Sequence, residues 1–591
     1  MHREKLVEAG LKRWEIGEIA SRIGQLYHTF YLRTSDAHFL REAFVFYDAV
    51  RRRSYFADCH ESPALAVKEL RYHARMIAQC VHLDRPDAAR DAAASFRASA
   101  DRYVQTHRGV ADAAEWHTMV EEADAFIAAE YAPPLHRSER RRHLRVVDDG
   151  EGERAPHAAR GGRGGAVGLK LGGAVLCGHS TSQVTFGGLH LDAHRMARAC
   201  EWGEQSSGDA SADRGGGGGA GPASDSAAAS DDTGTLDSRS VGSGERKRHV
   251  RAVSSGSAGE SGSIPEDWSS AASVRSPSGL SAALRGAGFG ARENPRKTVL
   301  SDPSASRLLS VIATAAEELP PRSALLVYVS ARRGGGPPRG GVRLRDGGDG
   351  GAEKRAQGGG WAAAAAKEEG SASRRNGAPL EPDAALYPSD LAPFTRRPML
   401  LVVDGDDARQ FCAAAEPGAS VPGGETPAVL CAPPAPPPRA PPGRTSGAFF
   451  TAFLSSPLAG MCALCGPTVT AQMGDNADAA DRFSRAAAEV EREILDALGE
   501  DDAETHLGWA RLLRGGDPFL QRFIARFIMC RAMIAMHKTT RGEDAHVPTA
   551  APPLPDCVNA AKCTPWIMKI AKAAGCEREF AAPQTAPERA R

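Results

Sequence analysis

Aromatic residues are scarce in this 591-residue chain, at 6%, and none occurs between Trp202 and Trp268. Glycine and proline are abundant by comparison, with 63 and 39 residues. Segments of this composition cannot bury enough apolar surface to offset the entropy that is lost on ordering. We therefore predict disordered inserts at residues 203–291 and 332–382, and a basic, glycine-rich linker at residues 134–170.

The chain also lacks an excess of charge of either sign, with 73 Lys and Arg residues against 73 Asp and Glu residues. No global field attracts nucleic acid or an anionic membrane surface, so we expect no direct nucleic-acid binding. The 12 cysteines follow no regular spacing, which favours reduced thiols in an intracellular protein over a disulfide scaffold. The N-terminal sequence MHREKLVEAGLKRWE has no apolar core, so we expect no secretion signal.

Only one uncharged segment is long enough to cross a bilayer, residues 445–474 with the sequence TSGAFFTAFLSSPLAGMCALCGPTVTAQMG. Ser455, Ser456 and Pro457 interrupt it, and glycine and threonine dilute its second half. We predict a buried amphipathic helix that is broken at Pro457. A membrane-associated regulator, anchored through this segment, remains an alternative.

What the sequence does contain is a helical pattern over residues 1–133. The stretch IGEIASRIGQLYHTFYLRT places apolar residues at three- and four-residue steps, which predicts a helix with one buried face comprising Ile16, Ile19, Ala20, Ile23, Tyr27 and Phe30. The next stripe, which includes Ala43, Tyr47 and Val50, predicts a second helix after a turn at Ser35 and Asp36. Ser62 and Pro63 are typical of the start of another helix.

This first helical pair resembles a tetratricopeptide hairpin, in which a Leu-Gly-x-x-Tyr helix packs on an Ala-x-x-x-Phe helix. Ile23, Gly24 and Tyr27 match the first helix, and Ala43 and Tyr47 match the second. The connection is too long for that repeat, and no strict period recurs. We predict an irregular, tetratricopeptide-like stack of antiparallel helices, a class that usually binds proteins.

The remainder of the chain shows an α/β pattern. Residues 171–202 indicate a short strand or two and then a helix from about Asp192, and residues 292–331 and 383–580 form a C-terminal α/β and helical domain. Apolar, β-branched runs predict buried parallel strands at residues 324–331, 398–405 and 428–432. Helices are expected at residues 304–319, 481–498 and 518–538. The predicted fold class is thus α/β, a small parallel sheet packed with C-terminal helices after a large all-α N-terminal part.

Asp404, Asp406 and Asp407 follow a predicted strand, at the edge where open α/β sheets bind ligands. A phosphate- or metal-dependent enzyme that uses Asp404 and Asp406 is therefore an alternative function. The sequence contains no phosphate loop of the form G-x-x-x-x-G-K-[ST]. We interpret the three carboxylates as an acidic turn that precedes the next helix near Ala408.

Other short motifs lack the context that their chemistry requires. Cys462 and Cys465 form a C-x-x-C without a second pair nearby, and Cys177 with His179 is equally isolated, so buried free thiols are expected. The sequence GAGFG at residues 286–290 lies in low complexity, not between a strand and a helix. We assign no catalytic, cofactor-binding or metal-binding residues, no cofactor, and no enzymatic activity.

Two basic clusters, RSERRRHLR at residues 137–145 and ERKRHVR at residues 245–251, lie in predicted links. Clusters of this kind are typical of nuclear-import signals or nucleic-acid patches, and they also occur as solubilising charge between domains.

Several longer blocks resemble the suppressor of cancer cell invasion family. The longest is LKRWEIGEIASRIGQLYHTFYLRTSDAHFLREAFVFYDAVRRRSYF at residues 11–56. The others follow in family order, at residues 67–80, 175–186, 292–295, 386–404, 445–458 and 519–538. The chain starts almost at the first block, so we expect that helices preceding it in the family are missing here.

The resemblance implies a transcriptional cofactor that acts by protein binding. Members of the family repress the program driven by serum response factor and its myocardin-related coactivators, which restrains Rho-linked gene expression and cell migration. Animal members are also linked to DNA double-strand-break repair. The expected location is the nucleus and cytoplasm, with membrane association as an alternative, and the binding surface is not identified by the sequence.

Overall fold

The structure, a computed structural model, describes residues 3–57, 62–107, 109, 112–132, 168–180, 183–201, 294–331, 341–344, 384–415, 426–500, 507–513 and 516–581. These residues all belong to one compact unit formed by Met1–Gly203 and Arg292–Arg591. The predicted insert 203–291, most of the linker 134–170 and most of the insert 332–382 lie outside the described residues. So do both basic clusters and the GAGFG sequence.

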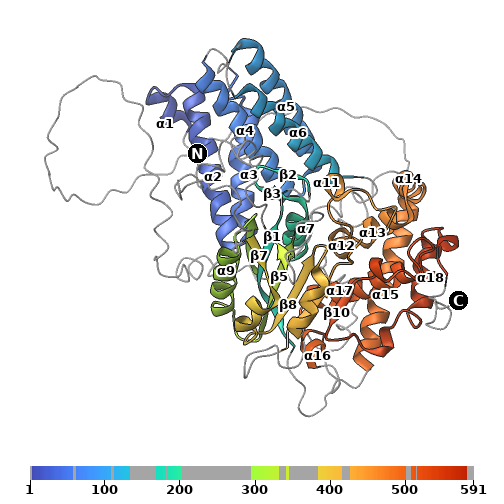
Figure 1. Ribbon diagram of the computed structural model, residues 1–591. Helices are drawn as coiled ribbons and strands as arrows, with labels where there is room; N and C mark the ends of the chain where they lie inside the picture. The colour runs from blue at the N-terminus through green and yellow to red at the C-terminus, as the bar shows by residue number, and fades with distance from the viewer. Residues whose placement is uncertain are drawn as a thin grey trace, which may run out of the picture. The chain divides into compact units, whose positions relative to one another are not determined.

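The N-terminal part is helical, as predicted, and consecutive helices pack against one another (Figure 1). Its helices are α1 (Arg3–Glu8), α2 (Arg13–Thr34), α3 (Ala37–Arg52), α4 (Pro63–His82), α5 (Pro86–Thr106) and α6 (Ala113–Glu130). The Asp36 side chain caps α3 by accepting a hydrogen bond from the backbone N–H of His38 at 2.9 Å. Pro63 occupies the first turn of α4, after Ser62 at the N-cap position.

The buried face of α2 differs from the predicted one. Ile16, Ala20 and Gly24 are buried, but Ile19 and Phe30 are 36% and 52% exposed. Small residues decide this, because Gly24 lets α3 approach until Tyr47 Cε2 lies 2.9 Å from the position of a Cβ atom at residue 24. The close-packed face of α2 is therefore centred on its small residues, and part of the apolar stripe is left in solvent.

The sheet has six strands in the order β10-β9-β8-β5-β1-β4. All neighbours pair in parallel except β10, which is antiparallel to β9. The strands are β1 (Lys170–Gly178), β4 (Arg296–Ser301), β5 (Ser323–Ser330), β8 (Met399–Asp404), β9 (Ala428–Cys431) and β10 (Thr549–Ala551). The three predicted strands match β5, β8 and β9 to within one residue. The edge strands β4 and β10 were not predicted, because neither is a continuous apolar run.

The two faces of the sheet build different cores. On one face, Leu325, Val327 and Val329 of β5 pack with α9 (Ala305–Glu317), η3 (Pro388–Phe394) and η4 (Ala408–Ala415). On the other face, Leu326 and Tyr328 of β5 share a core with α7 (Leu191–Ala199), α12 (Phe449–Ser455) and α17 (Pro518–Met536). Figure 1 shows α9 apart from the orange and red C-terminal helices on either side of the strands. Because both faces are covered, β5 is buried along its whole length.

The C-terminal helices include the segment 445–474. It forms the end of α11 (Gly443–Ser446), then α12, α13 (Pro457–Cys465) and most of α14 (Pro467–Asp475). The break falls at Ser456 and Pro457, as predicted, and α13 is buried nearly all round. Among the described helices, none combines the length and the apolar character that a bilayer crossing requires. The remaining helices are α15 (Ala477–Glu500), α16 (Leu507–Leu513), α18 (Thr564–Ala573), and the short η6 (Asp544–His546), η7 (Asp556–Val558) and η8 (Glu577–Glu579).

Two small hairpin sheets accompany the main one. Strands β2 (Thr185–Phe186) and β3 (Leu189–His190) pair with each other, as do β6 (Val342–Arg343) and β7 (Ala385–Leu386). Strand β6 corrects the prediction that residues 332–382 form one insert without structure. Val342 and Leu344 are 3% and 0% exposed and join the core beside α9. The sequence did not indicate this strand, because Val342 and Leu344 are only two apolar residues among glycines and charged residues and form no recognisable period.

Candidate functional site

The sheet has a topological switch point between β1 and β5. The chain leaves β1 to form β4 on one side and then returns to form β5 on the other. In open α/β sheets, ligands usually bind at the carboxyl ends of the strands at such a point. A small-molecule site in this fold would therefore be expected at this edge of the sheet.

The chain's own residues fill this edge. Gln183 donates a hydrogen bond from Nε2 to Ser330 Oγ, at the end of β5, at 3.1 Å. The Gln183 Oε1 atom accepts from the backbone N–H of Asp192 at 2.6 Å, and the Asp192 carboxylate accepts from the N–H of Ala448 at 3.0 Å. All three polar side chains are at most 4% exposed. These hydrogen bonds join β5, α7 and the start of α12. The polar residues at this edge therefore stabilise the packing of these elements and do not face solvent.

The β2–β3 hairpin closes the other half of the edge, above β1 and β4. His190 Nε2 lies 3.2 Å from Ser301 Oγ at the end of β4. The ring sits so close to β1 that a Cβ atom on Gly178 would be 2.4 Å from its Nδ1. Burial lowers the pKa of His190 to about 4, against a smaller opposing effect of Asp302. The imidazole is thus neutral at pH 7 and is packed as part of the core.

Asp404, the strongest catalytic candidate in the sequence, also points inward. Its Oδ2 accepts a hydrogen bond from Thr451 Oγ1 on α12 at 2.6 Å, and Thr451 Oγ1 lies 2.8 Å from the hydroxyl of Tyr328. Asp404 is 1% exposed. Burial is also the main cause that raises the pKa of Tyr328 well above its usual value. The alternative in which Asp404 serves an enzyme requires this carboxylate to face a ligand, but in the structure it holds β8, β5 and α12 together.

The other two carboxylates of the motif lie in the turn that follows β8. Asp406 and Asp407 are half-buried, and Asp407 Oδ1 accepts a hydrogen bond from Gln410 Nε2 at 3.2 Å. The 3-10 helix η4 follows, in agreement with the interpretation as an acidic turn. Within the ranges that the structure describes, no three His, Cys, Asp or Glu side chains are grouped so that they could hold a metal ion.

The cysteine motifs are buried in helices and strands. Cys462 and Cys465 on α13 are each 5% exposed, and Cys465 Sγ lies 3.6 Å from Met461 Sδ. The neighbouring Cys576 thiol and burial raise the pKa of Cys465 far above its usual value. Burial likewise raises the pKa of Cys177. The Cys465 and Cys177 thiols are therefore protonated at pH 7, which makes them poor nucleophiles and metal ligands.

A network of half-buried charged side chains joins the N-terminal helices to α7, and sequence reasoning missed it. Arg198 Nη2 pairs with Asp84 at 2.9 Å, and Arg198 Nη1 pairs with Glu130 of α6 at 2.8 Å. Arg195 Nε donates to the same Glu130 at 3.3 Å. No local motif marks such a network, because its members come from the turn after α4, from α6 and from α7, and meet only in the fold.

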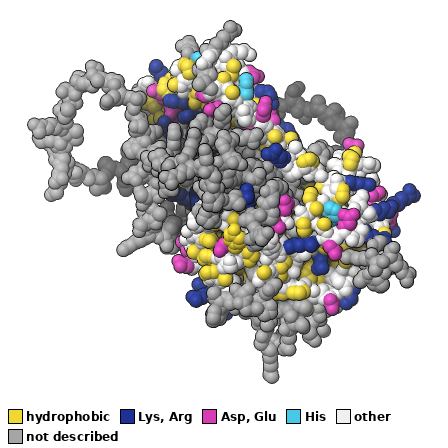
Figure 2. Space-filling model, in the orientation of Figure 1, with side chains coloured by type: hydrophobic (Ala, Val, Ile, Leu, Met, Phe, Trp, Pro, Cys, Tyr) yellow, Lys and Arg dark blue, Asp and Glu magenta, His cyan; other side chains and the backbone are white. Residues whose placement is uncertain are grey.

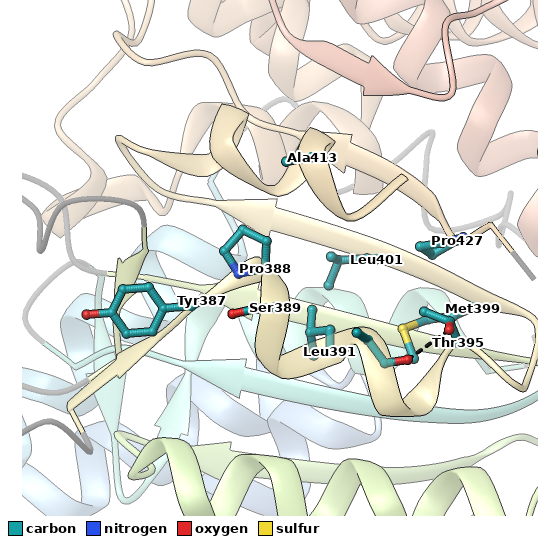
Figure 3. A pocket seen from close by; sticks show the side chains of 10 residues that line it. Tyr387, Pro388, Ser389, Leu391, Thr395, Met399, Leu401, Ala413 and Pro427 are labelled. Atoms are coloured by element: carbon teal, nitrogen blue, oxygen red, sulfur yellow. Dashed lines mark hydrogen bonds between the residues drawn. The ribbon is translucent and has the colours of Figure 1, made fainter. Parts of the chain in front are cut away.

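A cavity among the described residues lies elsewhere, between η3 and η4 over β8 (Figure 3). Its volume is about 420 Å³. The lining is mainly apolar and includes Leu391, Met399, Leu401 and Pro427. The Thr395 hydroxyl in its wall already donates to the carbonyl of Ala392 at 2.8 Å. The cavity therefore offers little convergent polar chemistry for recognising a small molecule.

A second feature on the surface is apolar and unusual for a water-exposed helix. We define the α2–α3 surface as the exposed and half-buried apolar side chains between these helices, namely Ile19, Ile23, Leu26, Tyr27 and Phe30 of α2 with Phe39 and Phe46 of α3. Contiguous exposed apolar patches commonly mark protein-interaction sites. Over the described residues on the face in Figure 2, by contrast, Lys and Arg side chains alternate with Asp and Glu, without a large area of one sign.

Comparison with known proteins gives one consistent result. A family model described as Protein SCAI matches residues 1–540. The chain is 29% identical over 565 residues to Protein SCAI of Homo sapiens and 30% identical over 565 residues to Protein SCAI of Mus musculus, covering 94% of this chain and 77% of each relative. A Protein SCAI homolog of Dictyostelium discoideum is 43% identical over 123 residues, which are 20% of this chain and 16% of that protein. The chain therefore belongs to the SCAI family.

Proposed function

We propose that this protein is a transcriptional cofactor of the corepressor type that acts by binding other proteins. Following the family resemblance, its partners are serum response factor or myocardin-related coactivators, and its output is lower Rho-linked gene expression and restrained cell migration. A contribution to DNA double-strand-break repair belongs to the same proposal. The protein works in the nucleus, to which the basic clusters at residues 137–145 or 245–251 direct it.

One observation carries the proposal: the ligand edge of the sheet is filled while an apolar helical surface is exposed. The side chains of Gln183, Asp192 and Asp404 form hydrogen bonds to other residues of the same fold. The α2–α3 surface instead presents side chains such as Leu26 and Phe30, which are 61% and 52% exposed. Covering this surface therefore supplies free energy for binding a protein, whereas the polar groups of the described residues at the switch point are already engaged in contacts within the fold.

A reporter experiment tests the proposal. The full chain is expressed in cells that carry a promoter driven by serum response factor, together with a matched promoter that lacks the response element. We expect lower output from the first promoter alone, and recovery of a myocardin-related coactivator with the tagged chain. Equal output from both promoters, with no coactivator recovered, would overturn the proposal.

The enzyme alternative is tested separately with the purified protein. Turnover of a generic phosphate ester is measured with Mg²⁺ for the natural chain and for Asp406→Asn, a substitution of nearly equal size at a half-buried position, with circular dichroism to check the fold. Asp404→Asn is added as a second variant, with circular dichroism as a check because Asp404 is an interior hydrogen-bond acceptor. Activity that is lost in folded Asp406→Asn would favour the enzyme over the cofactor.

A further inference from the structure

Few of the described cysteines can be reached from solution. Nine of the eleven are buried, whereas Cys412 and Cys557 are half-buried. Buried cysteines behave as small apolar side chains, and reactive ones are partly exposed. Cys412 lies on η4, which packs over the end of β9. It therefore has the access that a reagent in solution requires.

A second thiol lies beside Cys412. The Sγ atoms of Cys412 and Cys431 are 3.9 Å apart, and Cys431 is the last residue of β9. The Cys431 thiol donates to the carbonyl of Ala408 in η4 at 2.9 Å, which holds this sulfur against the helix that carries Cys412. Bonded sulfurs are about 2.05 Å apart, so rotation of the two side chains has to close a gap of about 2 Å.

Cys465 and Cys576 show why access matters as well as proximity. These two thiols are also neighbours, since Cys576 is the main cause of the raised pKa of Cys465. Both are only 5% exposed, so neither sulfur is open to a reagent in solution. The Cys412–Cys431 pair instead combines one accessible sulfur with one that is fully buried.

The surroundings of Cys431 determine when its sulfur can react. Its pKa lies well above the usual value, first because of the Cys412 thiol and then because of burial. The Thr549 hydroxyl and the Arg409 guanidinium act in the opposite direction, and Arg409 donates a hydrogen bond to the carbonyl of Val547 at 3.0 Å. Oxidation of Cys412 removes the thiol that is the main cause of the rise. Cys431 is therefore a poor nucleophile in the reduced protein and a better one once Cys412 is oxidised.

We propose that Cys412 and Cys431 form a peroxide-sensitive pair, in which Cys412 is oxidised first and Cys431 converts it to a disulfide. The Cys412 sulfur attacks hydrogen peroxide, the O–O bond breaks, and one oxygen remains as a sulfenic acid while the other leaves as water. The Cys431 sulfur then attacks the Cys412 sulfur. The S–O bond breaks, and the hydroxyl group leaves with the Cys431 proton as a second water. The two sulfurs together give two electrons to the peroxide.

The disulfide would connect η4 to the sheet through residues that are 19 positions apart in the sequence. A reducing thiol restores both cysteines by thiol–disulfide exchange. In a reducing compartment such a bond is transient, as in redox-sensing proteins. This modification site does not depend on the transcriptional role, so a chain that fails to repress can still form the disulfide.

Peptide mapping of the full chain tests the proposal. The reduced protein is treated with a small excess of hydrogen peroxide, its remaining thiols are alkylated, and the digest is analysed by mass spectrometry. We expect one main linked pair of peptides, Cys412 to Cys431, which a reducing thiol separates. The same treatment in urea should give several pairings, because the fold no longer selects these two sulfurs. No linkage in the folded chain, a main linkage of other cysteines such as Cys557 to Cys563, or the same mixture with and without urea overturns the proposal.

Variants assign the two roles. In Cys431→Ala the Cys412 sulfenic acid has no neighbouring thiol, so labelling of Cys412 by dimedone, a reagent for sulfenic acids, should rise several-fold over the natural chain. Cys412→Ser should abolish the linked peptide and leave Cys431 unlabelled, since Cys431 is fully buried. Cys557→Ser is the matched control at the other half-buried cysteine, and it should leave the linked peptide unchanged.

Circular dichroism confirms that each variant is folded, and the mapping of the natural chain decides the proposal if Cys431→Ala is not. Equal dimedone labelling of Cys412 with and without Cys431 would contradict the assignment of Cys431. Loss of the linked peptide in Cys557→Ser would contradict the assignment of Cys412 as the first site of oxidation.

Discussion

At the scale of single residues, Gly24 sets how closely α2 and α3 approach. A Cβ atom at this position would lie 2.9 Å from Cε2 of Tyr47, which is fully buried. We expect Gly24→Leu to overpack the contact at a cost of about 1–3 kcal/mol. Better helix propensity returns at most about 1 kcal/mol. Urea unfolding should therefore show a net loss of stability.

The control for Gly24→Leu is Gln25→Ala, one residue along the same helix. Gln25 is half-buried and lies about 100° further round the helix than Gly24, so its replacement should leave the unfolding midpoint nearly unchanged. A higher midpoint for Gly24→Leu would mean that the two helices do not meet at this glycine.

His194 makes stability depend on pH. The side chain is buried against Phe126 and His82, and neither ring nitrogen has a hydrogen-bond partner. Burial, with Arg198 and Arg195 nearby, holds its pKa well below the usual value. Below about pH 6.5 the unfolded chain binds a proton that the folded chain does not, so His194 destabilises the fold progressively as pH falls, by about 1.4 kcal/mol per pH unit.

His194→Phe removes this one proton and should reduce the slope between pH 6.5 and pH 5 by about 1.4 kcal/mol per pH unit, while His190 and His82, whose pKa values burial also lowers, still contribute. Urea unfolding at several pH values measures the slope. His38→Phe, at an exposed position on α3, should leave the slope as it is in the natural chain. A slope that is the same in His194→Phe and the natural chain would show that His194 is protonated in the folded protein.

At the scale of elements, one buried ion pair connects three helices. Arg526 of α17 donates from Nε to Glu491 of α15 at 2.7 Å, and from Nη1 to the carbonyl of Ser455 at 2.7 Å. The second contact satisfies the C-terminal end of α12, whose last carbonyls have no partner within the helix. Both charged side chains are at most 9% exposed. The pair therefore fixes α12 against the C-terminal helices.

Glu491→Ala should cost about 3–5 kcal/mol, because it leaves the Arg526 guanidinium buried without a counter-charge. The matched control is Glu493→Ala in the same helix, whose partner Lys569 is an exposed side chain with a second contact to Glu489. That change should alter the unfolding free energy little. Similar losses in the two variants would mean that solvent reaches Arg526.

At the scale of the whole molecule, the two predicted inserts should differ in importance. Replacing residues 204–291 by a short Gly-Ser linker should leave the thermal midpoint within a few degrees, because the segment has no apolar period to contribute to a core. Deleting residues 332–382 should lower it clearly, since Val342 and Leu344 leave the core beside α9.

A deletion of residues 346–383 that spares β6 is the control for the second insert. It should behave like the first deletion, because β6 and β7 keep their pairing. Scanning calorimetry of the three deletion variants would contradict this expectation if the deletion that spares β6 unfolded as early as the one that removes it.

The sequence by itself determined the elements with a strong local period. The helices of residues 1–133, the buried runs that became β5, β8 and β9, and the break at Pro457 all follow from nearest-neighbour patterns, because burial on one or both faces repeats along a helix or strand. The Gly24 contact with Tyr47 was also accessible, since a glycine within an apolar stripe predicts close approach. Family membership followed from collinear blocks of sequence.

Tertiary structure alone decided where the polar and leftover apolar groups lie. The sequence places Asp404 at the end of a strand, where a carboxylate can face a ligand. In the fold, α12 brings Thr451 to it from 47 residues further along the chain, and the Thr451 hydroxyl donates a hydrogen bond to the carboxylate. The helical period predicts that Ile19 and Phe30 are core residues. In the fold, α3 packs on the small residues of α2, so both side chains are exposed to solvent. A sequence fixes how apolar and polar side chains alternate; only the approach of distant elements decides which of them is covered.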